Sequence, residues 1–189
     1  MRLIMMGPPG AGKGTQADIV CASMSIPHIS TGDIFRANVT QGTALGVEAK
    51  RYMDAGEYVP DGVTNAMVRD RLDEADCAAG FLLDGYPRTI EQVGVLDAML
   101  SAQGVGIDVV VELTVDIDVV VKRLVKRAHD QGRADDTEEV IRRRLEVFAE
   151  QTAPLTSLYA SRGLLAQVSG MGEIPAVTAR IEAAISASA

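Results

Sequence analysis

Several features that would place a chain in a special class are scarce or missing here. The 189 residues include only two cysteines, Cys21 and Cys77, which lie far apart and have no metal-ligand spacing. We therefore expect neither a disulfide framework nor a zinc site, and we expect both thiols to be buried as small hydrophobic side chains. No stretch of about 18 uncharged apolar residues is present, and the apolar run at the N-terminus is too short for a signal peptide. These absences predict a cytoplasmic protein with no membrane partner.

Positive charge is also scarce. The chain has 18 Lys and Arg against 26 Asp and Glu, for a net charge of −8. This balance argues against nucleic acid as a partner, because a polyanion would be repelled overall. Only 4 of the 18 cationic residues are lysines. The others are arginines, whose planar guanidinium binds phosphate with two parallel hydrogen bonds. An acidic chain with clustered arginines indicates a small polyphosphate ligand.

Short apolar runs alternate with longer helical patterns along the chain. Strands are expected at residues 2–6, 81–84, 109–115 and 164–168, with a weaker candidate at 28–29. Helices are expected at residues 13–23, 32–40, 46–55, 60–74, 90–103, 116–128, 137–159 and 174–186. This alternation predicts an α/β fold, a five-stranded parallel sheet with helices on both faces, which binds its ligand at the carboxyl ends of the strands. The length fits one domain over residues 1–189.

Two segments depart from the alternation. Residues 30–59 contain short helical patterns without a clear strand, which predicts a helical insertion between two strands of the core. The polar stretch RAHDQGRADD at 127–136 carries a glycine and links two helical patterns, so we expect a mobile loop there. Both segments lie close in sequence to arginines.

A glycine-rich loop is the strongest single motif. The sequence GPPGAGKGTQ at 7–16 follows the first apolar run, and Lys13 opens a helical pattern. Backbone N–H groups, the helix N-terminus and the lysine together form a cradle for nucleotide phosphates. The alternative is a turn whose glycines serve only tight packing. Gly14 stands where such motifs usually have the Ser or Thr that binds Mg²⁺, with Thr15 one residue later, so the ion must depend on phosphates, water and an acid elsewhere.

The sequence FLLDGYPR at 81–88 supplies that acid. Asp84 ends an apolar strand beside the expected loop, where its carboxylate can hold Mg²⁺ through the water shell of the ion. Gly85 and Pro87 predict a sharp turn that directs Arg88 back across the strand ends. The alternative is a plain Asp-Gly turn without a ligand.

Further polar residues gather in the insertion and near the polar loop. In ISTGDIFR at 29–36, Thr31 and Arg36 can reach one ligand, although Asp33 is equally explained as a charge that favours a helix start.

Converging arginines stabilise the charge that develops in phosphoryl transfer, although each arginine alone is equally explained as part of a solvated helix face. The candidate arginines are Arg123, Arg127, Arg133 and Arg142 to Arg144, of which the consecutive three cannot all face one site. We expect His28 and His129 to be structural or exposed, because phosphoryl transfer from a nucleotide to an already ionised phosphate needs no general base.

Together these motifs resemble the adenylate kinase family of nucleoside monophosphate kinases, in family order and over essentially the whole chain. The motifs that carry the resemblance are GPPGAGKGTQ (7–16), ISTGDIFR (29–36), GEYVP (56–60), LLDGYPRT (82–89) with Gln92, GRADD (132–136) and RRRLEV (142–147). The resemblance implies a P-loop kinase in which 30–59 is the insertion that binds the nucleoside monophosphate and 126–136 is a short lid. No cysteine lies in this lid, which is similar to the form without zinc.

The resemblance also implies residue roles. The implied ATP-binding residues are Gly10, Ala11, Gly12, Lys13, Gly14, Thr15, Arg123, Arg127 and Gly172. The implied AMP-binding residues are Thr31, Arg36, Glu57, Tyr58, Val59, Gly85, Tyr86, Pro87, Arg88, Gln92, Arg133 and Arg144. The implied catalytic residues are Lys13, Arg88, Arg127, Arg133 and Arg144, with Asp84 as the Mg²⁺ residue. The implied reaction is reversible in-line transfer of the γ-phosphoryl group from Mg·ATP to AMP, giving two ADP, by a monomer that closes to exclude water.

Three other functions share parts of this pattern. A UMP/CMP kinase shares the phosphate loop and the Asp84 turn, but its relatives commonly carry Ala and Asn at the positions of Thr31 and Gln92. A P-loop kinase with a non-nucleotide acceptor would not need the Thr31 and Arg36 pair together with Gln92. A non-catalytic nucleotide sensor would be favoured by loss of Lys13, Asp84 or the lid arginines, all of which are present.

Overall fold

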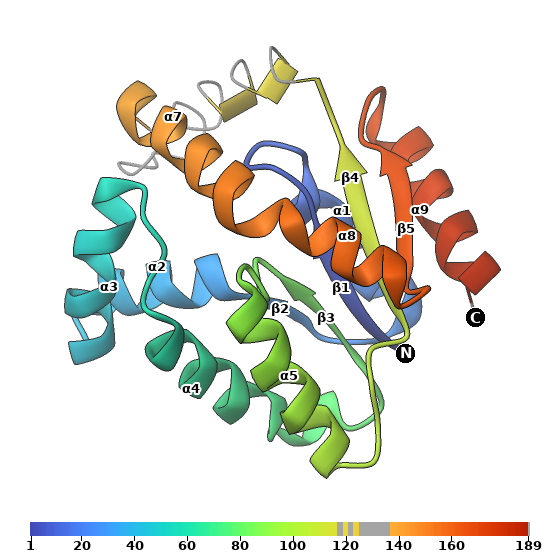
Figure 1. Ribbon diagram of the computed structural model, residues 1–189, viewed down its shortest axis with the longest axis horizontal. Coiled ribbons are helices and arrows are strands. Elements are labelled where there is room, and N and C mark those ends of the chain that lie inside the picture. The colour runs from blue at the N-terminus through green and yellow to red at the C-terminus, as the bar shows by residue number, and fades with distance from the viewer. Residues whose placement is uncertain (117–118, 121–122, 125–136, 189) are drawn as a thin grey trace.

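The computed structural model describes residues 1–116, 119–120, 123–124 and 137–188. Its five strands form one parallel sheet in the order β2-β3-β1-β4-β5, so β1 lies at the centre (Figure 1). The strands are β1 (Arg2–Met6), β2 (His28–Ser30), β3 (Phe81–Asp84), β4 (Val109–Thr114) and β5 (Leu165–Ser169). The predicted α/β class is confirmed, and the strand positions agree with the apolar runs because a sheet buried on both faces selects continuous hydrophobic segments.

Helices cover both faces of the sheet, as the alternation predicts (Figure 1). One face packs against α1 (Lys13–Met24) and α9 (Ile174–Ser188), and the other packs against α4 (Asp61–Leu72), α5 (Ile90–Ala102) and α8 (Pro154–Ser161). The period-two geometry of a strand divides the side chains of β1 between these faces. Leu3 and Met5 lie in the core with α1 and α9, whereas Ile4 and Met6 lie in the core with α4 and α5.

Two helices between β2 and α4 form the insertion. They are α2 (Thr31–Gln41) and α3 (Ala44–Ala55), which lie at one side of the sheet in Figure 1. Local capping explains their bounds: the hydroxyl of Ser30 accepts from Asp33 N–H at the start of α2, and Gly42 ends it in the left-handed conformation. The insertion has its own small core around Phe35, Ala49 and Val59.

The prediction of a single helix at 137–159 is wrong. The structure instead has α7 (Glu138–Val147), a π-helical turn η2 (Phe148–Thr152) and then α8. Pro154 lacks an N–H group and cannot continue a regular helical ladder, and Ala153 N–H donates to Phe148 O, five residues back, at 2.9 Å. Apolar spacing alone does not register this wider turn. Of the helix predicted at 116–128, the described residues 119–120 and 123–124 are helical.

Two further expectations concern the cysteines and the membrane. Cys21 and Cys77 are both free and buried, as predicted. Burial, the largest cause, raises the pKa of the Cys21 thiol to about 12 and that of Cys77 to about 11. Among the helices that the structure describes, none is long and apolar enough to cross a bilayer. A short 3₁₀ turn, η1 (Ala75–Cys77), precedes β3.

Replacing Gly94 with alanine is expected to stabilise the protein by about 0.5–1 kcal/mol. Gly94 is an exposed residue inside α5, and a Cβ added there would have no described atom within 4 Å. Alanine therefore removes backbone freedom from the unfolded chain without a new contact in the folded one. Urea unfolding measures the change, and a loss of stability would contradict the helical geometry at this position.

Candidate active site

A glycine-rich loop joins the carboxyl end of β1 to the start of α1. Gly10 and Gly12 have φ of +81° and +95°, a conformation that L side chains rarely adopt. Gly12 is the N-cap of α1, and within the described chain no side chain caps this helix start. The first backbone N–H groups of α1 are therefore available to an anion. Lys13 Nζ donates to the carbonyl oxygens of Gly7 and Pro8 at 2.8 and 3.0 Å, which holds the ammonium group at the same loop.

Asp84 ends β3 directly beside this loop. A Cβ added to Gly14 would lie 3.8 Å from Asp84 Oδ2, and Asp84 is only 9% exposed. His28 Nε2 lies 3.7 Å from the same carboxylate oxygen, and His28 Nδ1 lies 2.8 Å from Asp18 Oδ1. Burial by itself would lower the pKa of His28, but the carboxylates of Asp84 and Asp18 outweigh it and raise this pKa. The strand end thus places an oxygen ligand next to the phosphate loop.

The turn at 85–88 forms the opposite wall. Arg88 Nε donates to Gly85 O at 2.7 Å, and Thr31 Oγ1 donates to the same oxygen at 2.9 Å. Gly85 has φ of +80°, and a Cβ there would lie 2.8 Å from Arg88 Nη2 and 2.9 Å from Thr31 Oγ1. Glycine is required at this position because both side chains approach its backbone. The guanidinium of Arg88 also lies 4.7 Å from the centre of the Tyr58 ring, within cation–π range.

Thr152 of η2 supports Arg88 from the other side. Its hydroxyl donates to Arg88 O at 2.9 Å and lies 2.8 Å from the hydroxyl oxygen of Tyr58. Thr152 is 5% exposed and lines the cavity. Sequence reasoning missed this residue, because the π-helical turn that directs it inward has no hydrophobic signature. The only local signal was Pro154, which lies inside the predicted helix.

Gln92 lies in the first turn of α5 and is 1% exposed. Its Oε1 accepts from the backbone N–H of Arg88 at 2.7 Å, and its Nε2 donates to Asp61 Oδ1 at 2.6 Å. On α2, the guanidinium of Arg36 pairs with Asp33 and lies over Gly32. Asp33 is in the first turn of α2, where the helix dipole favours its charge. This position agrees with the interpretation of Asp33 as a charge that favours a helix start.

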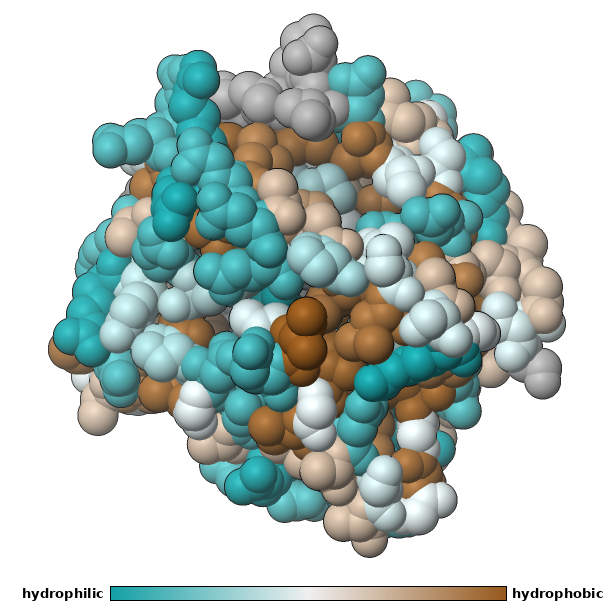
Figure 2. All heavy atoms as spheres, in the orientation of Figure 1, coloured by the Kyte–Doolittle hydropathy of each residue, from teal (hydrophilic) through white to brown (hydrophobic). Residues whose placement is uncertain are grey.

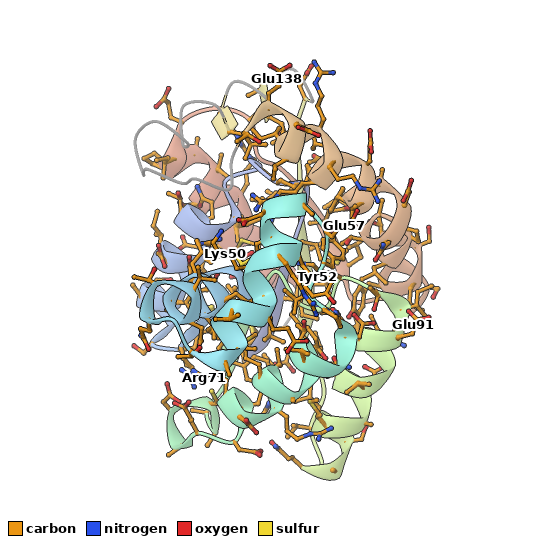
Figure 3. The ribbon with its side chains drawn as sticks, turned by 90° about the vertical axis from the view of Figure 1, so that its left-hand side faces the viewer. Lys50, Tyr52, Glu57, Arg71, Glu91 and Glu138 are labelled. Carbon is orange, nitrogen blue, oxygen red and sulfur yellow. The ribbon has the colours of Figure 1, made fainter. Side chains whose placement is uncertain are left out.

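The three consecutive arginines of α7 point in different directions, as the helical spacing predicts. Arg144 lines the cavity, and its Nη2 donates to Met53 O at 3.5 Å. Arg142 pairs with Glu138 on the exposed side of α7. Arg143 Nε lies 2.7 Å from Glu57 Oε1, which joins α7 to the end of the insertion. Glu57, which follows α3, is labelled in Figure 3. This hydrogen bond to Glu57 is the main cause of the raised pKa of Arg143.

Arg123 connects the phosphate loop to the loop after β5. Its Nη1 donates to Ala11 O at 3.4 Å and to Gly170 O at 3.3 Å. A Cβ added to Gly170 would lie 3.2 Å from Ala11 O and 2.9 Å from a methyl of Val115, so the two loops are in close contact. Gly172, which has φ of +105°, follows in the same loop and lines the cavity.

These walls enclose one cavity of about 640 Å³. The lining includes nearly all of the described residues that the sequence singled out: Gly10, Ala11, Gly12, Lys13, Gly14, Thr15, Thr31, Arg36, Glu57, Tyr58, Val59, Asp84, Gly85, Pro87, Arg88, Gln92, Arg123, Arg144 and Gly172. Further lining residues that sequence reasoning did not select include Phe35, Met53, Thr64, Phe148, Thr152 and Ile174. Most of these are apolar, and their sequence pattern resembles that of core residues.

Among the expected site residues that the structure describes, Tyr86 is not part of this lining. Tyr86 is 1% exposed, and its hydroxyl donates to Asn65 Oδ1 at 2.7 Å, so its side chain lies in the core. Arg127 and Arg133 lie outside the described residues, as do His129 and the expected lid at 126–136. Within the described part of the chain, no three His, Cys, Asp or Glu side chains are grouped as a metal site.

The fold and the site define a class. A parallel sheet whose central strand runs through a glycine-rich loop into a helix with Lys13 at its start, with an acid at the adjacent strand end, is typical of P-loop kinases. The cavity extends from this loop to a second wall with Arg88 and Gln92.

The comparisons with known proteins identify the family. The family model described as "Adenylate kinase" matches residues 5–164. The adenylate kinase of Nocardioides sp. (strain ATCC BAA-499 / JS614) is 65% identical over 181 residues, which cover 96% of this chain and 95% of the relative. That of Kocuria rhizophila is 59% identical over 184 residues, with 97% and 98% covered. That of Thermobifida fusca is 57% identical over 185 residues, with 98% of each chain covered.

The chain therefore belongs to the adenylate kinase family. It is a nucleoside monophosphate kinase, and its reaction is the reversible transfer of the γ-phosphoryl group of ATP to AMP to give two ADP.

Proposed function

We propose that the two nucleotides lie at opposite ends of the cavity, with their phosphates facing. The ATP phosphates lie on the loop at Gly10 to Thr15, and Lys13 exchanges its contacts with Gly7 O and Pro8 O for phosphate oxygens. The observation that carries this placement is the start of α1, where backbone N–H groups and the ammonium of Lys13 converge. Arg123 and Gly172 border the same end of the cavity, where they contact ATP.

The acceptor AMP occupies the end formed by the insertion at 30–59. Its base lies against Gln92 and the backbone of Glu57 to Val59, and its phosphate meets Arg36 and Arg88. The support for this placement is that Thr31 and Arg88 share the Gly85 carbonyl while Gln92 is hydrogen bonded to the Arg88 backbone. Thr31, Arg88 and Gln92 are therefore close enough together for one ligand to contact all three.

Mg²⁺ accompanies ATP as part of the donor substrate. The residues fit such an ion, because Asp84 offers a hard carboxylate oxygen beside Gly14, whose lack of a side chain leaves the approach from the loop open. Asp84 would hold the ion through water, and the ion would supply charge neutralisation at the phosphates. We infer no bound zinc.

The arginines perform most of the catalytic work. Negative charge is spread over the transferred group in the transition state, and guanidinium groups around it stabilise this charge. Arg88 lines the cavity from the turn after β3 and Arg144 lines it from α7. We propose that Arg127 and Arg133 join them from the lid at 126–136. Closure of the lid and the insertion would exclude water, which otherwise competes with AMP for the phosphoryl group.

The test is diphosphate formation from Mg·ATP with AMP, dAMP, UMP, CMP and GMP in parallel. Rapid ADP formation with AMP, and little product with the pyrimidine nucleotides, is the expected result. Activity mainly with UMP or CMP would keep the transfer chemistry and contradict the assignment of Gln92 and Thr31 to adenine. ATP binding without transfer to any acceptor would contradict the enzymatic role.

We further propose that the enzyme acts as a monomer in the cytoplasm. Two buried free thiols suit a reducing compartment. The large exposed hydrophobic side chains of the described chain, Ile19, Val47, Ile90, Met171 and Ile174, come from different elements. On the face shown in Figure 2, hydrophilic side chains cover α3 and the start of α7, and the hydrophobic areas are interrupted by polar ones. A sedimentation velocity measurement tests the monomer.

A further inference from the structure

We propose that Asp61 is a positioning residue that holds the amide of Gln92 in the one orientation that matches adenine, and so determines which purine the acceptor site takes. This inference rests on the proposed function, in which Gln92 meets the base of AMP. Asp61 begins α4 and does not line the cavity, so it acts through Gln92 and not by touching the substrate.

The contacts around Gln92 come from three different elements. From α4, Asp61 Oδ1 accepts from Gln92 Nε2 at 2.6 Å, and Asp61 Oδ2 accepts from the hydroxyl of Thr89 at 2.8 Å. Thr89 is the N-cap of α5, and its oxygen accepts from the backbone N–H of Gln92 at 3.1 Å. From the turn at 85–88, the backbone N–H of Arg88 donates to Gln92 Oε1 at 2.7 Å. Both polar atoms of the buried amide are therefore engaged.

The two partners of the amide cannot exchange roles. An ionised carboxylate only accepts hydrogen bonds, and a backbone N–H only donates them. If the Gln92 amide rotated by 180°, its NH₂ group would face the Arg88 N–H and its oxygen would face Asp61 Oδ1. Both contacts would then be repulsive at a site that is 1% exposed, where water cannot replace them. The surroundings thus select a single amide orientation.

A fixed amide distinguishes purines by their hydrogen-bonding edge. The amide of Gln92 retains one lone pair on Oε1 and one proton on Nε2 for a ligand in the cavity. Adenine offers a matching donor at its 6-amino group and an acceptor at N1. Hypoxanthine and guanine offer the reverse, an acceptor at O6 and a donor at N1, and would require the rotated amide. IMP is the sharpest probe, because it has nearly the shape of AMP with this edge reversed.

The experiment compares AMP and IMP as acceptors for the wild-type enzyme and for Asp61→Asn. Asparagine can present either its amide protons or its oxygen to Gln92, so it removes one of the two obstacles to rotation. We expect the ratio of kcat/KM for AMP to kcat/KM for IMP to fall about tenfold. IMP requires the rotated amide, and removing one of its two repulsive buried contacts is expected to change the ratio by about this factor. Asp61→Glu, which keeps a group that only accepts, should retain the wild-type ratio.

Two controls separate this role from a structural one. Asp70→Asn makes the same change of charge at an exposed position of α4 and should leave the ratio unchanged. Asp61→Ser is a second test variant, since serine also suits a helix start and its hydroxyl serves both amide orientations. Equal losses with AMP and IMP, which leave the ratio constant in both test variants, would overturn the inference. Failure of the wild-type enzyme to use AMP at all would instead overturn the proposed function on which this inference rests.

Discussion

Replacing Arg88 with lysine is expected to lower turnover at least tenfold while the protein remains folded. The guanidinium of Arg88 makes two contacts at once: Nε donates to Gly85 O at 2.7 Å, and Cζ lies 4.7 Å from the Tyr58 ring centre. These contacts orient the remaining N–H groups as a fork toward the cavity. Lysine keeps the charge but has one compact ammonium group, which cannot bond the carbonyl, stack on the ring and bind phosphate with two parallel hydrogen bonds.

The measurement is kcat and KM for AMP at saturating Mg·ATP, together with a melting curve. Arg162→Lys is a matched control, because Arg162 also lies over a tyrosine ring, that of Tyr159 at 5.7 Å, and pairs with Asp97 at 2.9 Å, but does not line the cavity. This control should retain full turnover. Near-normal turnover in Arg88→Lys would remove Arg88 from the transfer step.

Replacing Gly46 with alanine is expected to lower the free energy of unfolding by about 3 kcal/mol, the upper part of the usual range for overpacking, and to raise KM for AMP. Gly46 lies in α3 at its contact with α2. A Cβ there would lie 2.1 Å from the backbone oxygen of Asn38, and backbone cannot move aside as a flexible side chain can. The two helices must therefore separate, which disturbs the insertion that carries Arg36.

Gly62→Ala provides the comparison. Gly62 is also a helical glycine, but a Cβ added there would have nothing within 4 Å in the described structure. This variant should be slightly more stable than the wild type, with unchanged KM for AMP. Urea unfolding and acceptor titrations measure both effects. If Gly46→Ala matched Gly62→Ala in stability and in KM, the close packing of α2 on α3 would not contribute to the acceptor site.

The parts of the site that were predictable are those with a local physical cause. A glycine-rich turn between an apolar strand and a helix carries its own phosphate-binding geometry, so the loop at 7–16 and Lys13 were identified from neighbouring residues alone. Asp84 was predictable because carboxyl ends of parallel strands share one edge of the sheet, and β3 lies beside β1. Helical spacing also predicted that Arg142, Arg143 and Arg144 cannot all face one site, and the family resemblance selected Arg144 among them.

The parts that were not predictable depend on residues far apart in the chain. Asp61 and Gln92 are joined only because α4 and α5 pack side by side, and Thr152 meets Arg88 and Tyr58 only through the π-helical turn of η2. Tyr86 lies between Asp84 and Arg88 in the sequence, yet its side chain is buried in the core, where its hydroxyl donates to Asn65 Oδ1 and to the Gln92 carbonyl. Sequence spacing describes one helix or strand at a time and does not predict contacts between side chains of different elements.

By itself, the sequence determined the α/β fold class, the parallel sheet and the chemistry of its phosphate loop. Those properties follow from hydrophobic period, backbone freedom at glycine and charge type, each of which acts over a few neighbouring residues. Only the tertiary structure decided which polar groups face each other across elements: Arg88 on Tyr58, Asp61 on Gln92 and Glu57 on Arg143. Hydrogen bonds and ion pairs require atoms within about 3 Å in defined directions, and packing alone brings distant residues that close.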